Sequence, residues 1–323
     1  MTRIYLDTNI VSYLQHPEHY LSEPWQNDAY ALRSYLEHAE NIEVVYSPAH
    51  LMDMRKGYVK DELLAIEKLR FISNITRNRR IAKYMGSSEI VMERVDPEAF
   101  FFEKNAINAE FHVPGDEKLD YAAWVRENPV YEKLKNYKFD LVRLKETFTN
   151  FPVPLTESEK EPTVLNLMCD FAAFVGEMIN HDFSLYKPLR AQAMQETGMT
   201  GRLAGSLDPL SILLPMLMET DTGRRVLQGM YEMMAEKDPE GIIFGLFMNL
   251  DFMGFEKDKI AGNHGYMNLT TDATHCFYAS YCDFFVTNDE RTGKKSAAIY
   301  TYLGIDTKVM DMRKFAEWGN RKK

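Results

Sequence analysis

Residues 3–10 read Arg3-Ile4-Tyr5-Leu6-Asp7-Thr8-Asn9-Ile10, a short apolar run that ends in a carboxylate. Ile, Tyr and Leu suit a strand buried on both faces of a parallel sheet, whereas Asp does not, so we expect the strand to end at Asp7. In open α/β sheets, ligands bind outside the carboxyl ends of the strands. Asp7 is therefore the first candidate site residue.

The alternation of strand-like and helix-like segments extends to about residue 72 and returns near residue 262. Further strands are expected at Ile42–Tyr46, Phe284–Thr287 and Lys308–Met312. Ser47-Pro48 supplies a helix N-cap followed by proline at the first helical position, which predicts a helix over Ala49–Gly57. Another helix is expected to open at Asp272 and to run to about Tyr281. These elements predict an α/β domain with a central parallel sheet.

Residues 73–261 lack this alternation and read as mostly helical. Apolar residues recur at helical spacing from Val164 to Met178, which is typical of an amphipathic helix. A proline-rich, charged stretch near residues 150–163 is the best internal boundary. We therefore expect a discontinuous α/β domain, residues 1–72 plus 262–323, interrupted by a mostly α-helical inserted lobe, residues 73–261.

Composition narrows the class of protein. The chain has 323 residues, 45% of them hydrophobic, and a formal net charge of −10. At roughly 150 residues per domain, this length predicts about two domains. The negative charge repels phosphate, so any nucleic-acid contact is expected to be local. The three cysteines lack metal-ligand spacing, and the sequence has neither a secretory signal nor an apolar segment of membrane-spanning length. A cytoplasmic protein without a membrane partner is expected.

Four aspartates are the candidate catalytic and metal-binding residues: Asp7, Asp53, Asp272 and Asp289. A single Asp after a strand more often caps a helix or closes a turn than binds a ligand. Together, however, four carboxylates at the ends of strands and on adjoining helices would repel one another unless a hard cation neutralised them. Mg²⁺ or Mn²⁺ prefers such oxygen ligands, and the bound ion would orient water for attack on a phosphodiester.

Four short motifs carry a resemblance to a known family. They are Asp7-Thr8-Asn9, Ser47-Pro48-Ala49-His50-Leu51-Met52-Asp53, Asp272-Ala273-Thr274-His275 and Val286-Thr287-Asn288-Asp289. In this order they resemble the PIN domain, a metal-dependent ribonuclease fold. The resemblance implies a three-layer α/β/α domain that hydrolyses phosphodiester bonds of single-stranded or structured RNA as an endonuclease. Two features depart from the family pattern: Asp53 stands where glutamate is usual, and the spacing from Asp53 to Asp272 is much longer.

Other residues are expected to assist the four acids. Supporting side chains for the carboxylates or a metal-bound water are Asn9, Thr287, Asn288 and His275. For His275, a role in the core or in hydrogen bonding is favoured over direct catalysis, because metal-activated water needs no histidine base. Basic residues next to the acids are candidate phosphate contacts: Arg55, Lys56, Arg291, Lys294 and Lys295.

Two other classes of function stay open at this point. One is a catalytically silent PIN-like module that binds nucleic acid or protein, and the other is a haloacid-dehalogenase-like phosphatase with Asp7 as nucleophile. The sequence also leaves open an antitoxin-like protein partner and a homodimer. A zinc site at His16-Pro17-Glu18-His19 is not expected, because Pro17 interrupts the helical spacing of the histidines.

Overall fold

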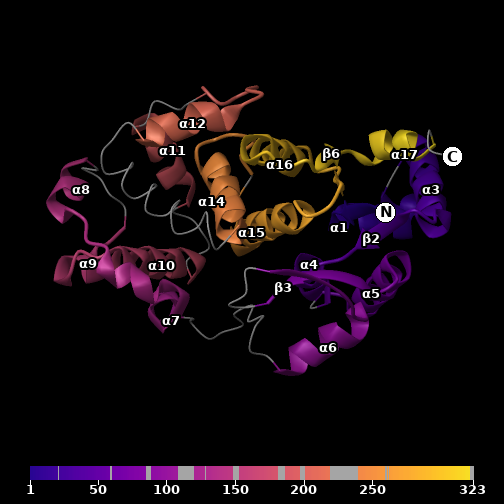
Figure 1. Cartoon of the computed structure of the whole chain (residues 1–323), viewed down its shortest axis with the longest axis horizontal. Coiled ribbons are helices and arrows are strands. Elements are labelled where there is room, and N and C mark those ends of the chain that lie inside the picture. The colour runs from indigo at the N-terminus through magenta and orange to yellow at the C-terminus, as the bar shows by residue number, and fades with distance from the viewer. Residues whose placement is uncertain are drawn as a thin grey trace. The chain divides into compact units, whose positions relative to one another are not determined.

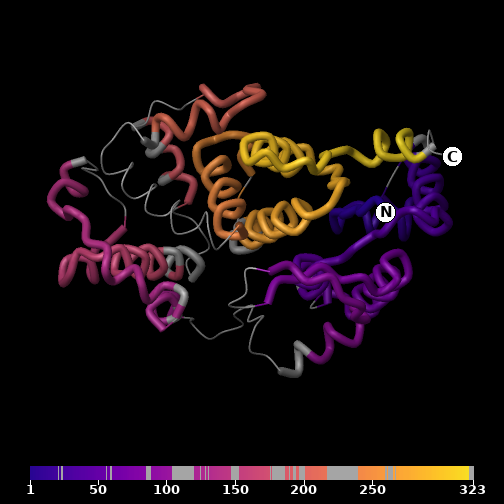
Figure 2. Tube along the Cα trace, in the orientation of Figure 1, coloured from indigo at the N-terminus to yellow at the C-terminus, as the bar shows by residue number. Residues whose placement is uncertain are grey.

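The structure, a computed structural model, describes residues 1–20, 22–58, 60–84, 89–107, 120–127, 129–147, 153–180, 186–196, 201–218, 239–258, 260 and 262–320 (Figures 1 and 2). The chain divides into two compact units. Unit 1 comprises Met1–His112, Asp238–Leu250 and Leu269–Lys323, and unit 2 comprises Val113–Lys237 and Asp251–Asn268.

Unit 1 contains a parallel sheet of four strands in the order β2-β1-β5-β6. The strands are β1 (Thr2–Leu6), β2 (Ile42–Val45), β5 (Phe284–Val286) and β6 (Lys308–Met310). All three pairings are parallel, with Ile4 beside Val44 on one side and beside Phe284 on the other. The strands predicted from the sequence are confirmed within one or two residues, and the predicted parallel sheet is confirmed with them.

Helices cover both faces of this sheet. On one face, Ile4, Leu6 and Val286 enter a hydrophobic core with residues of α1, α3, α5 and α17. On the other face, Tyr5 packs edge-on against His275 of α15, with ring centroids 5.7 Å apart. Helices α3 and α17 lie side by side near the two chain ends, where Tyr35 contacts Trp318 (Figure 1).

The helices of unit 1 in chain order are α1 (Thr8–Gln15), α2 (Pro17–Tyr20), α3 (Glu23–His38), α4 (Pro48–Tyr58), α5 (Glu62–Thr76), α6 (Pro97–Ile107), α14 (Pro239–Phe252), α15 (Gly262–Ala279), α16 (Glu290–Leu303) and α17 (Met312–Asn320). The end of α14 and the beginning of α15 fall in unit 2.

Two strands lie in the region that was expected to be mostly helical. Strands β3 (Arg79–Lys83) and β4 (Ile90–Arg94) form an antiparallel pair in unit 1. The pair adjoins the end of β2, because the Tyr46 N–H donates to Arg79 and the Tyr46 carbonyl accepts from Ile81. The local charge of Arg79, Arg80 and Lys83 hid these strands, since their sequence lacks the apolar run of a buried strand.

The described part of unit 2 is helical apart from an isolated bridge between Lys138 and Thr163. Its elements are α7 (Tyr121–Glu127), the 3₁₀ helix η1 (Pro129–Asn136), α8 (Leu141–Thr147), α9 (Thr156–Lys160), α10 (Val164–Asn180), α11 (Tyr186–Glu196) and α12 (Pro209–Met218). Buried Asp251 accepts hydrogen bonds from Tyr186 and Arg190, and so ties α11 to the end of α14. The predicted boundary near residues 150–163 falls partly outside the described residues.

Helix α15 begins ten residues before the predicted start at Asp272, which therefore lies inside the helix. Glycines and polar residues in its first turns have weak helix propensity and concealed this start. None of the described helices is both long and apolar enough to cross a membrane.

Candidate functional site

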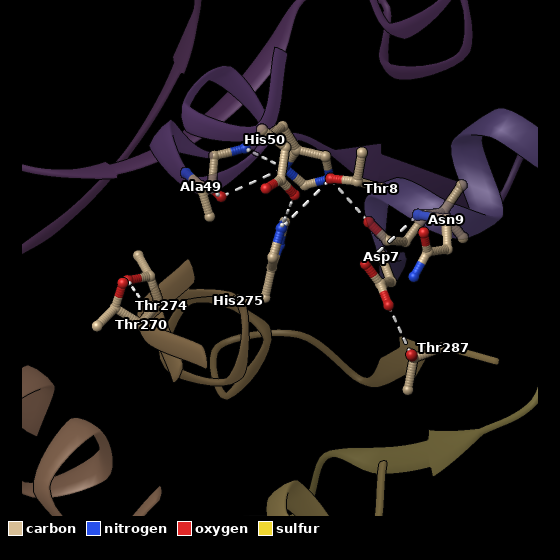
Figure 3. Close-up of polar contacts among 12 residues, drawn as sticks. Asp7, Thr8, Asn9, Ala49, His50, Thr270, Thr274, His275 and Thr287 are labelled. Carbon is tan, nitrogen blue, oxygen red and sulfur yellow. Dashed lines mark hydrogen bonds and ion pairs between the residues drawn. The ribbon is translucent and has the colours of Figure 1, made fainter. Parts of the chain in front are cut away.

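Asp7 lies at the carboxyl end of β1 and is 4% exposed. It is the N-cap of α1, where its carboxylate accepts a hydrogen bond from the Asn9 N–H at 3.5 Å. The other carboxylate oxygen accepts from the Thr287 hydroxyl at 2.7 Å (Figure 3). Burial raises the pKa of Asp7, while His275 and Thr287 oppose this shift and the charge of Asp53 adds to it. The ionised form of Asp7 is therefore disfavoured by the fold.

Asp289 follows the neighbouring strand β5 and is linked to Asp7 through one residue. The Thr287 hydroxyl oxygen donates to Asp7 and also accepts from the Asp289 N–H at 3.1 Å. The Asp289 carboxylate caps α16 by accepting from the Thr292 N–H at 2.9 Å. Burial raises the pKa of Tyr13, and the charges of both acids add to this shift. Asp7 and Asp289 thus each cap a helix, and both lie at the edge of the sheet formed by the carboxyl ends of its strands.

Asp53 reaches the same region from α4. Its carboxylate lies 3.0 Å from Nε2 of His275, which projects from α15. The Thr8 hydroxyl lies 3.3 Å from the same nitrogen. Figure 3 shows the His275 ring pointing from α15 toward His50 and Thr8, on the side of the site away from Thr287. Asp53 and Asp7 are close enough for the charge of Asp53 to affect the pKa of Asp7.

A buried network of Tyr5, Ser47, His50 and His275 supports this arrangement, and the first three were not expected from the sequence. Because the Ser47 N–H can only donate, Nδ1 of His50, 3.1 Å away, accepts. Nε2 of His50 then carries the proton and donates to the Leu6 carbonyl at 2.7 Å. Burial lowers the pKa of His50 to about 3, with His275 adding to the effect, so His50 is neutral.

The same reasoning orients His275. Asp53 can only accept, so Nε2 of His275 donates to it. In the neutral imidazole, Nδ1 accepts from the Tyr5 hydroxyl at 2.7 Å, and that hydroxyl accepts in turn from Ser47 at 2.6 Å. Burial raises the pKa of Tyr5 far above its usual range, so its proton is retained. A directed chain of hydrogen bonds therefore runs from Ser47 through Tyr5 and His275 to Asp53.

Asp272 is half-buried on α15, one turn before His275. No three of the carboxylates of Asp7, Asp53, Asp272 and Asp289 bring their oxygens within 4.8 Å of one another in the described chain. Octahedral Mg²⁺ bonds of about 2.1 Å place even opposite ligands only about 4.2 Å apart. As arranged, at most two of these acids would bind Mg²⁺ directly, and water would complete its coordination. Mg²⁺ commonly binds in this way, so the donor set fits the ion.

The basic residues that were predicted to contact phosphate differ from one another in burial and in ion pairing. Lys295, which was predicted to contact phosphate, is fully buried, with its ammonium 4.8 Å from the ring of Phe247. Lys294 pairs with Glu290 at 2.8 Å. Arg55 and Arg291 are half-buried, and burial lowers the pKa of Arg55. The Lys56 side chain lies outside the described part of the structure.

Lys68 of α5 is a basic residue that the sequence did not single out. Burial lowers its pKa, and the nearby charge of Asp53 opposes this shift. Among the supporting residues, Asn9 is exposed beside Asp7, while the Asn288 side chain accepts from the Met312 N–H at 2.9 Å and so serves the start of α17. Lys68 is therefore a further candidate residue beside the predicted ones.

Comparisons with protein-family models, with curated proteins and with solved structures find no match to this chain.

Proposed function

We propose that this chain is a PIN-like endonuclease that depends on Mg²⁺ or Mn²⁺ and acts on RNA. The observation that carries the proposal is the placement of Asp7 and Asp289 after adjacent parallel strands, bridged by Thr287. Asp53 lies near Asp7, and its negative charge contributes to the raised pKa of that buried acid. Such crowding of carboxylates is the condition that a divalent cation relieves.

Asp7, Asp53, Asp272 and Asp289 would hold the ion, directly or through water. When bound, Mg²⁺ or Mn²⁺ supplies a Lewis acid for the phosphoryl oxygens and lowers the pKa of a bound water. Thr287 holds the Asp7 carboxylate, and His275 holds that of Asp53, so both acids are oriented before substrate arrives. Lys68, close to Asp53, is suited to contact a substrate phosphate.

The test uses the purified chain, single-stranded RNA and Mg²⁺ or Mn²⁺. We expect cleavage that stops in chelator, and a loss of at least about 100-fold in Asp7→Asn, since asparagine is a weaker cation ligand. Asn caps helices as well as Asp does, so the start of α1 is retained. Because the fold raises the pKa of Asp7, Asp7→Asn should melt no lower than the unmodified chain in chelator at pH 8. Full cleavage in chelator, or by Asp7→Asn, would contradict the proposal.

Asp140→Asn is the matched control. Asp140 is an exposed cap of α8 in unit 2, where its carboxylate accepts from the Arg143 N–H at 3.0 Å. The same change of charge at this cap should leave cleavage unaltered. Asp53→Ala should abolish cleavage and Asp53→Glu should retain part of it, because glutamate keeps the carboxylate that His275 contacts.

One observation favours a second candidate, a catalytically silent module that binds RNA. The Asp53 carboxylate already accepts a hydrogen bond from His275, and no three of the acids gather their oxygens within 4.8 Å in the described chain. This candidate predicts retention of RNA on a filter without cleavage at any Mg²⁺ or Mn²⁺ concentration. A phosphorylated Asp7 after incubation with a small phosphate ester would instead identify a phosphatase.

A further inference from the structure

Three possible metal ligands converge where α1 meets α2. His16 caps the end of α1, and Pro17 begins α2. His16, Glu18 and His19 each place one donor atom within 4.8 Å of the other two. Pro17 does interrupt the helical spacing, as predicted, but the three donors converge nevertheless, because the proline starts a new helical turn. In that turn the rings of His16 and His19 stack, with centroids 5.1 Å apart and planes inclined by 18°.

The distances suit a shared ion. One Glu18 oxygen lies 3.5 Å from Nδ1 of His16 and 3.9 Å from Nε2 of His19. Both exceed the roughly 2.7–2.9 Å of a charge-assisted hydrogen bond. Bonds of about 2.0–2.1 Å to tetrahedral Zn²⁺ separate neighbouring ligand atoms by about 3.3 Å. Small rotations of these partly exposed side chains would therefore bring all three donors onto one ion.

A fourth residue holds the carboxylate in place. The Tyr30 hydroxyl of α3 donates to the second oxygen of Glu18 at 3.2 Å, so the first oxygen is left toward the two imidazoles. An outer hydrogen bond that orients a ligating group is the usual support of a metal site.

We propose that His16, Glu18 and His19 form a surface site for a divalent transition metal of the Zn²⁺ class. Two imidazoles and one carboxylate favour Zn²⁺, Cu²⁺ or Ni²⁺, whereas Mg²⁺ prefers oxygen ligands alone. The site is separate from the four aspartates, because the eight residues of α1 span about 12 Å between Asp7 and His16. Its bound ion would link the end of α1 to α3 through Glu18 and Tyr30.

The experiment is a calorimetric titration of the untagged, chelator-stripped full chain with Zn²⁺. Replacing both histidines, His16→Ala with His19→Ala, should weaken binding by at least about 100-fold, because one protein ligand remains. Tyr30→Phe should weaken it by about 10-fold, the lower end of the effect that loss of an outer partner has. His38→Ala is the matched control: His38 is exposed, and its Nδ1 lies 2.8 Å from the Ser34 carbonyl on α3. Its removal should leave the affinity unchanged.

Co²⁺ provides a spectroscopic readout of the same site. A visible absorption band of tetrahedral Co²⁺ should appear with the unmodified chain and be absent from the double variant. Circular dichroism in chelator establishes that the variants are folded. Equal Zn²⁺ affinity in the unmodified chain and the double variant would overturn the proposal, as would an equal loss in His38→Ala. Mg²⁺-dependent RNA cleavage should persist in the double variant, so this site and the nuclease proposal can fail independently.

Discussion

At the scale of single residues, the neutral state of His50 makes stability depend on pH. The pKa of His50 is lowered from 6.5 to about 3 in the folded chain, mainly by burial. Between these values the unfolded chain binds more protons, so stability falls as the pH falls below about 6.5. At pH 5 the loss from this residue is about 2 kcal/mol relative to pH above 7. His50→Gln should remove this part of the pH dependence.

Urea unfolding in chelator from pH 8 to pH 5 measures the effect, with His38→Ala as the exposed control. If the free energy of unfolding of His50→Gln fell equally steeply from pH 8 to pH 5, His50 would be excluded as the source of the pH dependence. A second measurement needs no variant: ¹⁵N chemical shifts at pH 5 should show His50 neutral with its proton on Nε2. This tautomer follows from the hydrogen bonds with Ser47 and Leu6.

Sequence reasoning identified Asp7 because a carboxylate that ends an apolar strand is conspicuous. It missed Tyr5 and His50, since a tyrosine inside a buried strand and a histidine inside a helix look like ordinary core residues. Their roles depend on contacts across the fold, such as the 2.7 Å contact between Tyr5 and His275, 270 residues apart in the chain. One signal was available: a phenol buried on both sides needs a hydrogen-bond partner.

At the scale of elements, the sequence predicted the four parallel strands well and the helix starts less well. Apolar runs such as Phe284–Val286 indicate buried strands, because a strand that is covered on both faces must be hydrophobic along its whole length. The amino end of α15 and the charged strand β3 carry no such pattern. Their structure depends on the tertiary context, which local propensity does not contain.

Two glycines in helices of unit 1 should respond to alanine in opposite directions. Gly304 ends α16 in the left-handed region at φ 67°, and Gly57 lies inside α4. An added Cβ meets nothing within 4 Å at either position, so only backbone conformation decides. Gly304→Ala should lower the free energy of unfolding by about 1 kcal/mol, whereas Gly57→Ala should raise it by about 0.5–1 kcal/mol. Urea unfolding of both variants tests this, and the same sign for both would contradict it.

At the scale of the whole molecule, the charge distribution limits how the proposed nuclease binds RNA. The chain carries a formal net charge of −10, so its overall field repels a polyanion. Of the predicted basic residues, Lys295 is buried and Lys294 pairs with Glu290. Among the side chains that the structure describes, Arg55, Arg291 and Lys68 are then the candidates for phosphate contact, and Lys56 stays a prediction. RNA binding should therefore rest on few phosphate contacts and on the ion at the acidic site.

Salt dependence measures that number of contacts. Each phosphate contact with a single strand contributes about −0.7 to the slope of log K against log salt, so two or three contacts predict a slope near −2. The measurement uses Asp7→Asn, which we expect to bind RNA without cleaving it, at fixed Mg²⁺ and varied KCl. Lys68→Met should reduce the steepness by about 0.7, since it removes one cation near Asp53. A slope of about −4 or steeper would require an extended basic surface. That result would contradict local binding at the edge of the sheet where Asp7 and Asp289 lie.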